Sequence, residues 1–289
     1  MKRILFLFLF AIVLTACEKR DIPTQNIAYQ SKLVVNSLFD NENAFRVFVS
    51  KSESSLSGIR PQYLSNAEVL LFKNNVFIDT LDYDLVDNYY FTSEVAEVGA
   101  QYSVRVKSAG SLQEASAMAT LPNLQNFGGL TYTDSIGVDG GGLITSQLNL
   151  NFTDFAGQSN YYRLSFLYFS PATQSFLPFD FDTDDEILLN PGTIHADDGS
   201  YLFSDALFTG RTRNITIRFP QITATGTPRY AVKFEALSEE AYRYITTLEQ
   251  FQAQQSTNSP FQEPVLVFSN IQNGVGIFAG STIARDTIY

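Results

Sequence analysis

The single cysteine of this 289-residue chain, Cys17, limits what the chain can fold into more than any other residue. It follows an uncharged apolar run, residues 4–13, which Lys2 and Arg3 precede. A basic start and a short apolar run are typical of an export signal, and this run is too short to cross a bilayer, which takes about 20 residues. Since no second cysteine is present, the exported body is expected to lack disulfides and to be held together by apolar cores alone.

Three residues that stand directly before the cysteine, Leu14, Thr15 and Ala16, complete a lipobox. The sequence therefore predicts a signal peptide over residues 1–16, cleavage before Cys17 and acylation of that cysteine, with a plain secretory signal as the alternative. Several acyl chains on one residue anchor a protein stably, because each buried methylene contributes about 0.8 kcal/mol. Residues 17–30 then comprise the lipidated cysteine and a polar tether.

The charge of the chain bears on its partners. The formal net charge is −11, and loss of Lys2 and Arg3 with the signal makes it −13. A body this acidic is not expected to bind nucleic acid or anionic lipid headgroups. The 25 phenylalanines and 15 tyrosines favour strands.

Residues 31–122 have the pattern of short strands and turns. Apolar residues alternate with polar ones over residues 45–49, as a half-buried strand requires. Asn74 and Asn75 separate two apolar runs and tolerate positive φ, which predicts a hairpin with a two-residue turn. About seven closely spaced strands predict a β-sandwich of immunoglobulin-like or transthyretin-like type. The further strand candidates are residues 32–35, 88–92, 101–107 and 113–121.

Residues 123–289 are predicted to form a second β-rich domain with one packed helix. Its strand candidates are residues 143–152, 160–169, 213–219, 229–237, 264–270 and 274–280. Gly274 and Gly276 in the last of these indicate that two backbones approach closely there. Ser238 can cap a helix over about residues 238–255, in which apolar residues recur at helical spacing.

An acidic segment holds the only candidate metal ligands, Asp180, Asp182 and Asp184, whose alternate spacing suits hard cations such as Ca²⁺. The segment lacks the glycine and glutamate of an EF-hand loop, so a solvated acidic loop is the preferred interpretation. His195 is the only histidine and lies near Asp197, but no nucleophile-elbow pattern accompanies it. The sequence therefore predicts a protein that is not an enzyme, without catalytic residues or a cofactor, and leaves Ca²⁺ open.

Several segments occur in the order in which a known family has them. They are residues 66–69 (NAEV), 160–163 (NYYR), 204–210 (SDALFTG), 237–244 (LSEEAYRY), 261–264 (FQEP) and 269–280 (SNIQNGVGIFAG). In these the chain resembles a Bacteroidota family of outer-membrane lipoproteins of unknown function, over nearly the whole mature chain. The resemblance implies an outer-membrane location and a TonB-dependent β-barrel receptor of the SusC type as partner, since family members are typically encoded beside such receptors. It brings no catalytic residue.

Three functions remain as hypotheses. The first is a non-catalytic accessory or binding component of a TonB-dependent nutrient uptake system, anchored in the outer membrane by lipid. The second is an envelope assembly or adhesion module that binds other outer-membrane proteins. The third is a hydrolase of glycan or peptide. The mixed charges of residues 18–21 leave the cell surface and the periplasmic face of the membrane both open.

Overall fold

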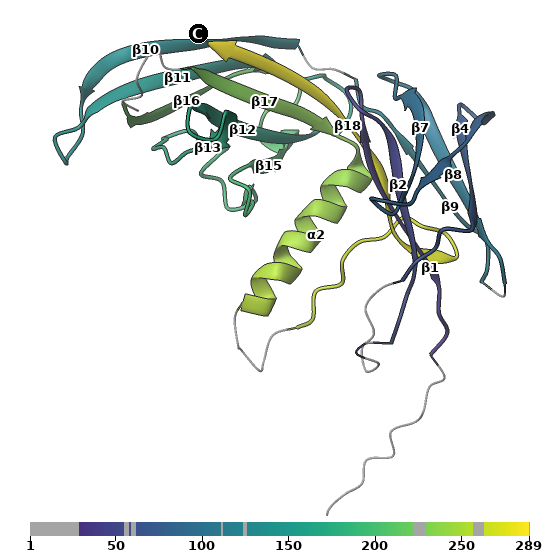
Figure 1. The fold of residues 1–289 in the computed structure, drawn as a ribbon. Helices are drawn as coiled ribbons and strands as arrows, with labels where there is room; N and C mark the ends of the chain where they lie inside the picture. The colour runs from purple at the N-terminus through teal and green to yellow at the C-terminus, as the bar shows by residue number, and fades with distance from the viewer. Residues whose placement is uncertain are drawn as a thin grey trace, which may run out of the picture. The chain divides into compact units, whose positions relative to one another are not determined.

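A computed structural model describes residues 29–54, 58, 62–110, 112–123, 126–221, 229–256 and 263–288. Contacts group Ser31–Tyr289 into one compact unit, separate from Met1–Gln30. Most of the described chain is strand, and its one α-helix is α2 (Glu239–Ser256), so the predicted mainly β fold is confirmed (Figure 1). Neither α2 nor any other helix in these ranges is long and apolar enough to cross a membrane. The predicted signal peptide and nearly all of the predicted tether lie outside the described residues.

The described strands form three sheets. The first half of the chain contributes β1 (Leu33–Asp40), β2 (Ala44–Lys51), β3 (Gln62–Tyr63), β4 (Ala67–Lys73), β5 (Val76–Thr80), β6 (Asp82–Asp84), β7 (Tyr89–Val95), β8 (Gln101–Ser108) and β9 (Ala115–Thr120). The second half contributes β10 (Asn126–Val138), β11 (Ile144–Thr153), β12 (Tyr161–Ser170), β13 (Ser175–Pro178), β14 (Ile194–His195), β15 (Tyr201–Ser204), the 3-10 helix η1 (Asp205–Leu207), β16 (Thr212–Pro220), β17 (Tyr230–Leu237) and β18 (Gly274–Ile288). The largest sheet has the order β14-β15-β12-β17-β18-β1-β2-β7-β6, and the smaller sheets are β10-β11-β16 and β5-β4-β8-β9.

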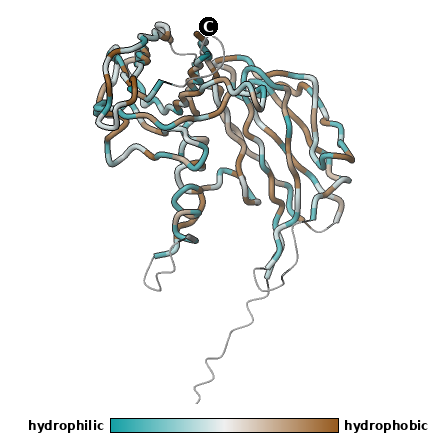
Figure 2. Tube along the Cα trace, turned by 60° about the vertical axis from the view of Figure 1, so that its left-hand side comes forward, coloured by the Kyte–Doolittle hydropathy of each residue, from teal (hydrophilic) through white to brown (hydrophobic). Residues whose placement is uncertain are grey.

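The first core lies between β1, β2 and β7 of the large sheet and the β5-β4-β8-β9 sheet. Phe45 and Val47 of β2 are fully buried in it, which confirms the predicted alternation. Buried positions also alternate along β1 and β8, and Figure 2 shows hydrophobic and hydrophilic residues interspersed along the coloured trace. The predicted hairpin is present as β4 and β5, with Asn74 at φ 50° and Asn75 at φ 66°. Two sheets packed on one core give the sandwich-like arrangement that the sequence predicts.

A second core joins the β10-β11-β16 sheet to β12 and β17 of the large sheet. Aromatic residues dominate this core. Phe152, Tyr162 and Phe234 are almost fully buried, and their ring centroids lie 4.9–5.6 Å apart. A third, smaller cluster holds Leu237 of β17 and Ala241 of α2. Because alternate residues of a strand face opposite sides, the second core and α2 lie on opposite faces of β17.

The last strand, β18, belongs to both halves of the molecule. Its first part pairs in parallel with β1, with Leu33 opposite Gly274, and its last part pairs antiparallel with β17. In the part of β18 that does not pair with β17, the Asn270 side chain hydrogen-bonds to the backbone of Phe278 as a neighbouring strand would. Asn270 Nδ2 donates to the Phe278 carbonyl at 2.7 Å, and Asn270 Oδ1 accepts from the Phe278 amide at 3.0 Å. The predicted domain boundary is at residue 122, and β18 lies after it in the chain although Phe278 of this strand packs in the first core.

One predicted strand is wrong, and one long strand is missing from the predictions. Residues 264–270 are not a strand. Instead, α2 holds this segment through side chains, because Val265 N donates to Gln254 at 3.1 Å and Phe268 N donates to Thr247 at 2.9 Å. The long strand β10 was not predicted, since two register shifts interrupt its pairing with β11 and blur the period-two pattern.

Ser238 caps α2 and joins it to β18. Its Oγ accepts from Ala241 N at 3.2 Å and from Gly280 N at 3.4 Å. We expect Ser238→Ala to lower the free energy of unfolding by about 1–2 kcal/mol, because both amides lose their acceptor. Urea denaturation measures this change. Thr246→Ala, within the same helix, should be neutral or slightly stabilising, since the Thr246 hydroxyl only bonds back to the carbonyls of Tyr242 and Arg243 in its own helix. Equal losses in both variants would contradict the capping role.

Candidate binding groove and aromatic face

The predicted lipidation site, Cys17, lies outside the described residues. The three acidic candidates are described, and two of them contact Arg218: Asp182 forms an isolated bridge with it through the backbone, and Asp184 Oδ2 lies 3.3 Å from its guanidinium. Within the described ranges, no group of three or more His, Cys, Asp or Glu residues is placed to hold a metal ion. Asp180 instead lines a hollow of about 530 Å³ beside His195.

His195 is stacked on Tyr201, with ring centroids 4.6 Å apart and planes at 12°. Asp197 lines the same hollow, and its backbone amide donates a hydrogen bond to Glu249 Oε2 at 3.4 Å. In the described part of the chain, no hydrogen bond links the imidazole to a serine or an aspartate. The structure therefore does not assemble the serine–histidine–aspartate arrangement that the sequence left open.

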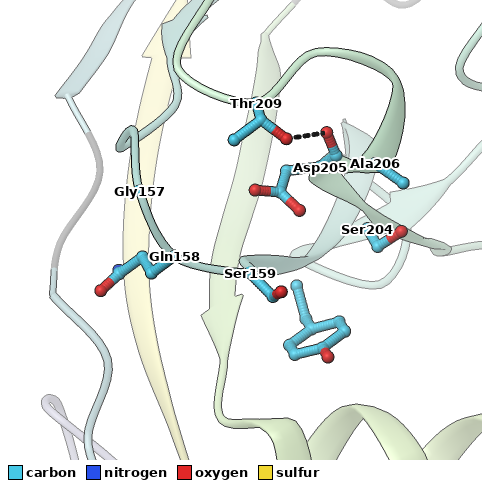
Figure 3. A pocket seen from close by; sticks show the side chains of 8 residues that line it. Gly157, Gln158, Ser159, Ser204, Asp205, Ala206 and Thr209 are labelled. Atoms are coloured by element: carbon cyan, nitrogen blue, oxygen red, sulfur yellow. Dashed lines mark hydrogen bonds between the residues drawn. The ribbon is translucent and has the colours of Figure 1, made fainter.

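A groove at the junction of several loops is the main candidate site. Its first part is a pocket of about 440 Å³ between the loop that precedes β12 and the η1 turn. Figure 3 shows the Asp205 carboxylate between Ser159 on one side and Thr209 on the other. The lining residues are Gly157, Gln158, Ser159, Tyr161, Ser204, Asp205, Ala206 and Thr209. The pocket is thus rich in hydroxyl, amide and carboxylate oxygens.

A hydrogen-bond network fixes the two loops of the pocket. Asn160 is central to it: its carbonyl accepts from Asp205 N at 3.0 Å, and its Nδ2 donates to Phe155 O at 2.9 Å and to Asp205 Oδ2 at 3.3 Å. Behind it, the buried Asp154 accepts hydrogen bonds from the Tyr162 hydroxyl and from Gly210 N. Burial, together with the Asp154 carboxylate, raises the pKa of Tyr162, which keeps that phenol protonated as a donor. The pocket walls are therefore held in one geometry.

The second part of the groove extends to the first turn of α2. It shares Gln158, Ser159 and Tyr161 with the pocket and adds Glu239 and Glu240. The Tyr161 ring is backed by Tyr242 of α2, stacked at 4.6 Å. Burial first, then the nearby charges of Glu239 and Asp205, raise the pKa of Tyr161. The lining of the groove thus includes the carboxylates of Asp205, Glu239 and Glu240.

No residue of this groove is predicted from the sequence as a ligand-binding residue, yet three of the resembling segments meet there. Residues 160–163 supply the wall of the pocket, residues 204–210 its opposite side, and residues 237–244 the rim. The segments lie on β12, η1 and α2, which come together only because β12 pairs with both β15 and β17. The order of segments in the sequence was the one signal that pointed to the groove.

A second candidate surface is the aromatic face, formed by Phe48, Tyr63, Tyr89 and Phe91 on the outer side of β2, β3 and β7. Phe48 lies 6.5 Å from Tyr63 and 5.6 Å from Tyr89, and Tyr89 lies 6.1 Å from Phe91. The Arg46 guanidinium carbon is 5.2 Å from the Tyr89 ring centre. Phe48, Tyr63 and Phe91 are 38%, 51% and 39% exposed. The sequence signal for this face is Phe48, an aromatic residue at one of the β2 positions that alternate with the buried ones.

Known proteins give few functional clues. No curated protein matches the chain. Among solved structures, a protein of Corynebacterium diphtheriae described as membrane anchored is 10% identical and has a TM-score of 0.22, over 73% of this chain and 55% of that one. The BSP domain of a biofilm associated protein is 8% identical with a TM-score of 0.20, over 88% of this chain and 58% of that one. The chain thus spans little more than half the length of either protein.

A family model gives a firmer assignment. The model described as "Domain of unknown function (DUF4249)" matches residues 19–287. This range includes the groove, the aromatic face and all described strands except the last residue of β18, Ile288. A match over nearly all of the chain does not depend on any single motif. The chain therefore belongs to the DUF4249 family.

Proposed function

We propose that this protein is an outer-membrane lipoprotein that acts, without catalysis, as an accessory binding component of a TonB-dependent nutrient uptake system. The aromatic face is the observation that carries the proposal. Four neighbouring rings and an arginine, partly exposed on one side of a sheet, have the composition of a protein–protein contact, because aromatic residues and arginine are enriched at interfaces. The partner proposed for this face is a SusC-type β-barrel receptor.

The lipobox supports the proposed location. Acyl chains on Cys17 would hold the body at the membrane in which the receptor is embedded, and residues 18–30 would provide the tether. Tethering raises the effective concentration of one protein beside another, so even a modest contact area would then be occupied. The groove near α2 offers a separate surface for the nutrient.

Capture of the partner tests the proposal. We expect the tagged lipoprotein, purified from solubilised outer membranes, to bring down a β-barrel receptor. The double variant Phe48→Ser/Phe91→Ser should recover at least tenfold less of it, since loss of a buried aromatic contact typically costs 1 kcal/mol or more and about 1.4 kcal/mol is tenfold. Quantitative mass spectrometry of the eluate gives the ratio.

Phe77→Ser is the matched control, because Phe77 is also an exposed aromatic, 52% accessible, but lies on β5 of the other sheet. It should recover the receptor as the unmodified protein does. Melting temperatures of the three proteins show whether the double variant is folded. Recovery of no β-barrel by the unmodified protein, or equal recovery by a folded double variant, would contradict the proposal.

The same aromatic face also favours a second candidate, an assembly or adhesion module that contacts other envelope proteins. A deletion strain separates the two functions. Loss of growth on the transported nutrient, with normal barrel assembly and attachment, supports the uptake role. Normal nutrient uptake with impaired barrel assembly or surface attachment supports the second function instead.

A further inference from the structure

Asp205 is an unusual residue for the floor of a pocket. Asp205 is only 4% exposed, yet its side chain faces the pocket. Oδ2 accepts one long hydrogen bond, 3.3 Å from Asn160 Nδ2, and Oδ1 has no hydrogen-bond partner among the described residues. A carboxylate that is largely shielded from water favours hydrogen-bond donors in place of that water. A ligand that donates hydrogen bonds to Oδ1 would supply them.

The surroundings of Asp205 accept hydrogen bonds more than they donate them. The Thr209 hydroxyl donates to Asp205 O at 3.1 Å, which leaves the lone pairs of the hydroxyl oxygen free to accept hydrogen bonds. Gln158 uses its amide nitrogen on Asn160 at 2.9 Å, which leaves its oxygen as an acceptor. No lysine or arginine is among the residues that line the pocket or the adjoining part of the groove.

The rim of the groove has the same sign of charge. Glu239 and Glu240 lie at the start of α2, where the helix dipole alone would attract an anion. Their two full negative charges outweigh a partial positive charge of about half a unit. Arg243 lies 3.6 Å from Glu239, but both side chains are exposed, so this pair is weak. The ring of Tyr161 adds an aromatic surface that favours cations.

We propose that this groove binds the primary ammonium group of a small organic cation, with Asp205 Oδ1 as its main acceptor. An ammonium group has three donors and no acceptor, which matches a pocket of carboxylate, hydroxyl and amide oxygens. Its charge offsets the buried carboxylate, and the aromatic Tyr161 and the carboxylates of the rim surround the rest of the molecule. This inference rests on the binding role in the proposed function and names the class of ligand, which could come from an amino sugar or from a peptide or polyamine.

Binding to the purified mature lipoprotein in detergent tests the proposal without a receptor. The probes are glucosamine, cadaverine and N-acetylglucosamine, the last of which keeps the sugar but removes the ammonium charge. We expect calorimetry to detect at least one of the two amines, with affinity at least tenfold above N-acetylglucosamine and falling as salt rises. Preference for glucosamine identifies an amino sugar, and preference for cadaverine identifies a peptide or polyamine source.

Asp205→Asn keeps the volume of the side chain and removes its charge, and should weaken amine binding at least tenfold. Asp180→Asn is the matched control, since Asp180 lines the other hollow beside His195, and it should bind amines normally. If Asp205→Asn does not fold, Glu240→Gln at the rim of the groove tests the site instead, and it should weaken amine binding severalfold.

Four results would overturn the proposal. They are binding of neither amine, equal binding of N-acetylglucosamine, unchanged affinity in folded Asp205→Asn and Glu240→Gln, and binding of CaCl₂ in place of the amines at Asp205. Each concerns the groove alone. A failure here therefore leaves receptor capture by the aromatic face untouched, and failed capture leaves amine binding untouched.

Discussion

A Cys17→Ser variant should carry no acyl label and should appear in the soluble fraction once its signal is removed. Serine has no thiol to form the thioether through which the lipid is attached, so the body loses its membrane affinity entirely. With each buried methylene worth about 0.8 kcal/mol, several acyl chains give stable anchoring, and their loss should release most of the protein. Metabolic labelling with an alkyne fatty acid, followed by fractionation, measures both results.

Thr15→Ala is the control for Cys17→Ser, because it keeps small residues before the cysteine and should still be acylated. Mass spectrometry of the mature amino terminus confirms the cleavage site. A Cys17→Ser protein that is cleaved normally and yet remains in the membrane fraction would show that the anchor lies elsewhere, and the proposed location would then lose its basis.

Gly276→Ala should have the largest effect on stability. Gly276 has φ +116°, a conformation that L-residues rarely adopt, and an added Cβ would lie 2.2 Å from Val35 O and 2.7 Å from Asn36 Oδ1. Both atoms belong to β1, which pairs with β18 in parallel, so relief of the clash must separate the two strands. We expect a loss of about 3 kcal/mol or more, which corresponds to roughly 6–12 °C in melting temperature.

Gly129→Ala separates the two causes of this effect. Gly129, in β10, has a similar φ of +103°, but an added Cβ there would meet no atom within 4 Å. It should therefore show only the conformational cost, about 1–2 kcal/mol. Thermal unfolding of both variants gives the difference. Equal destabilisation would mean that the close approach of β1 and β18 is not what requires glycine at position 276.

The sequence predicted best those elements whose signals are local. Asn74 and Asn75 both have the positive φ of a tight hairpin turn, a preference of the residues themselves. Ser238 caps α2 because a serine before a helical apolar stripe can satisfy a free amide. The strand predicted over residues 264–270 is wrong because its local pattern does not decide its structure. The apolar residues suit a strand, but backbone amides of this segment donate to the side chains of Gln254 and Thr247 on α2.

The candidate site could not be predicted in the same way. Asp205 looks like an ordinary acidic residue in the sequence, and only its burial and its free Oδ1 distinguish it. The candidates that the sequence did offer, Asp182 and Asp184, each contact Arg218, a residue of β16 far along the chain. Of these two, only Asp184 places its carboxylate beside the Arg218 guanidinium, because Asp182 contacts Arg218 through the backbone.

The sequence by itself determined the predicted lipid anchor at Cys17, the mainly β character, the hairpin turn and the position of α2. These depend on hydrophobic period, turn chemistry and capping, which act over a few residues. Only the tertiary structure decided that Gly274 lies opposite Leu33, that three distant segments enclose Asp205, and that aromatic rings from β2, β3 and β7 share one face. Such pairings depend on the free energy of contacts between residues far apart in the chain, and that free energy is not contained in any local pattern.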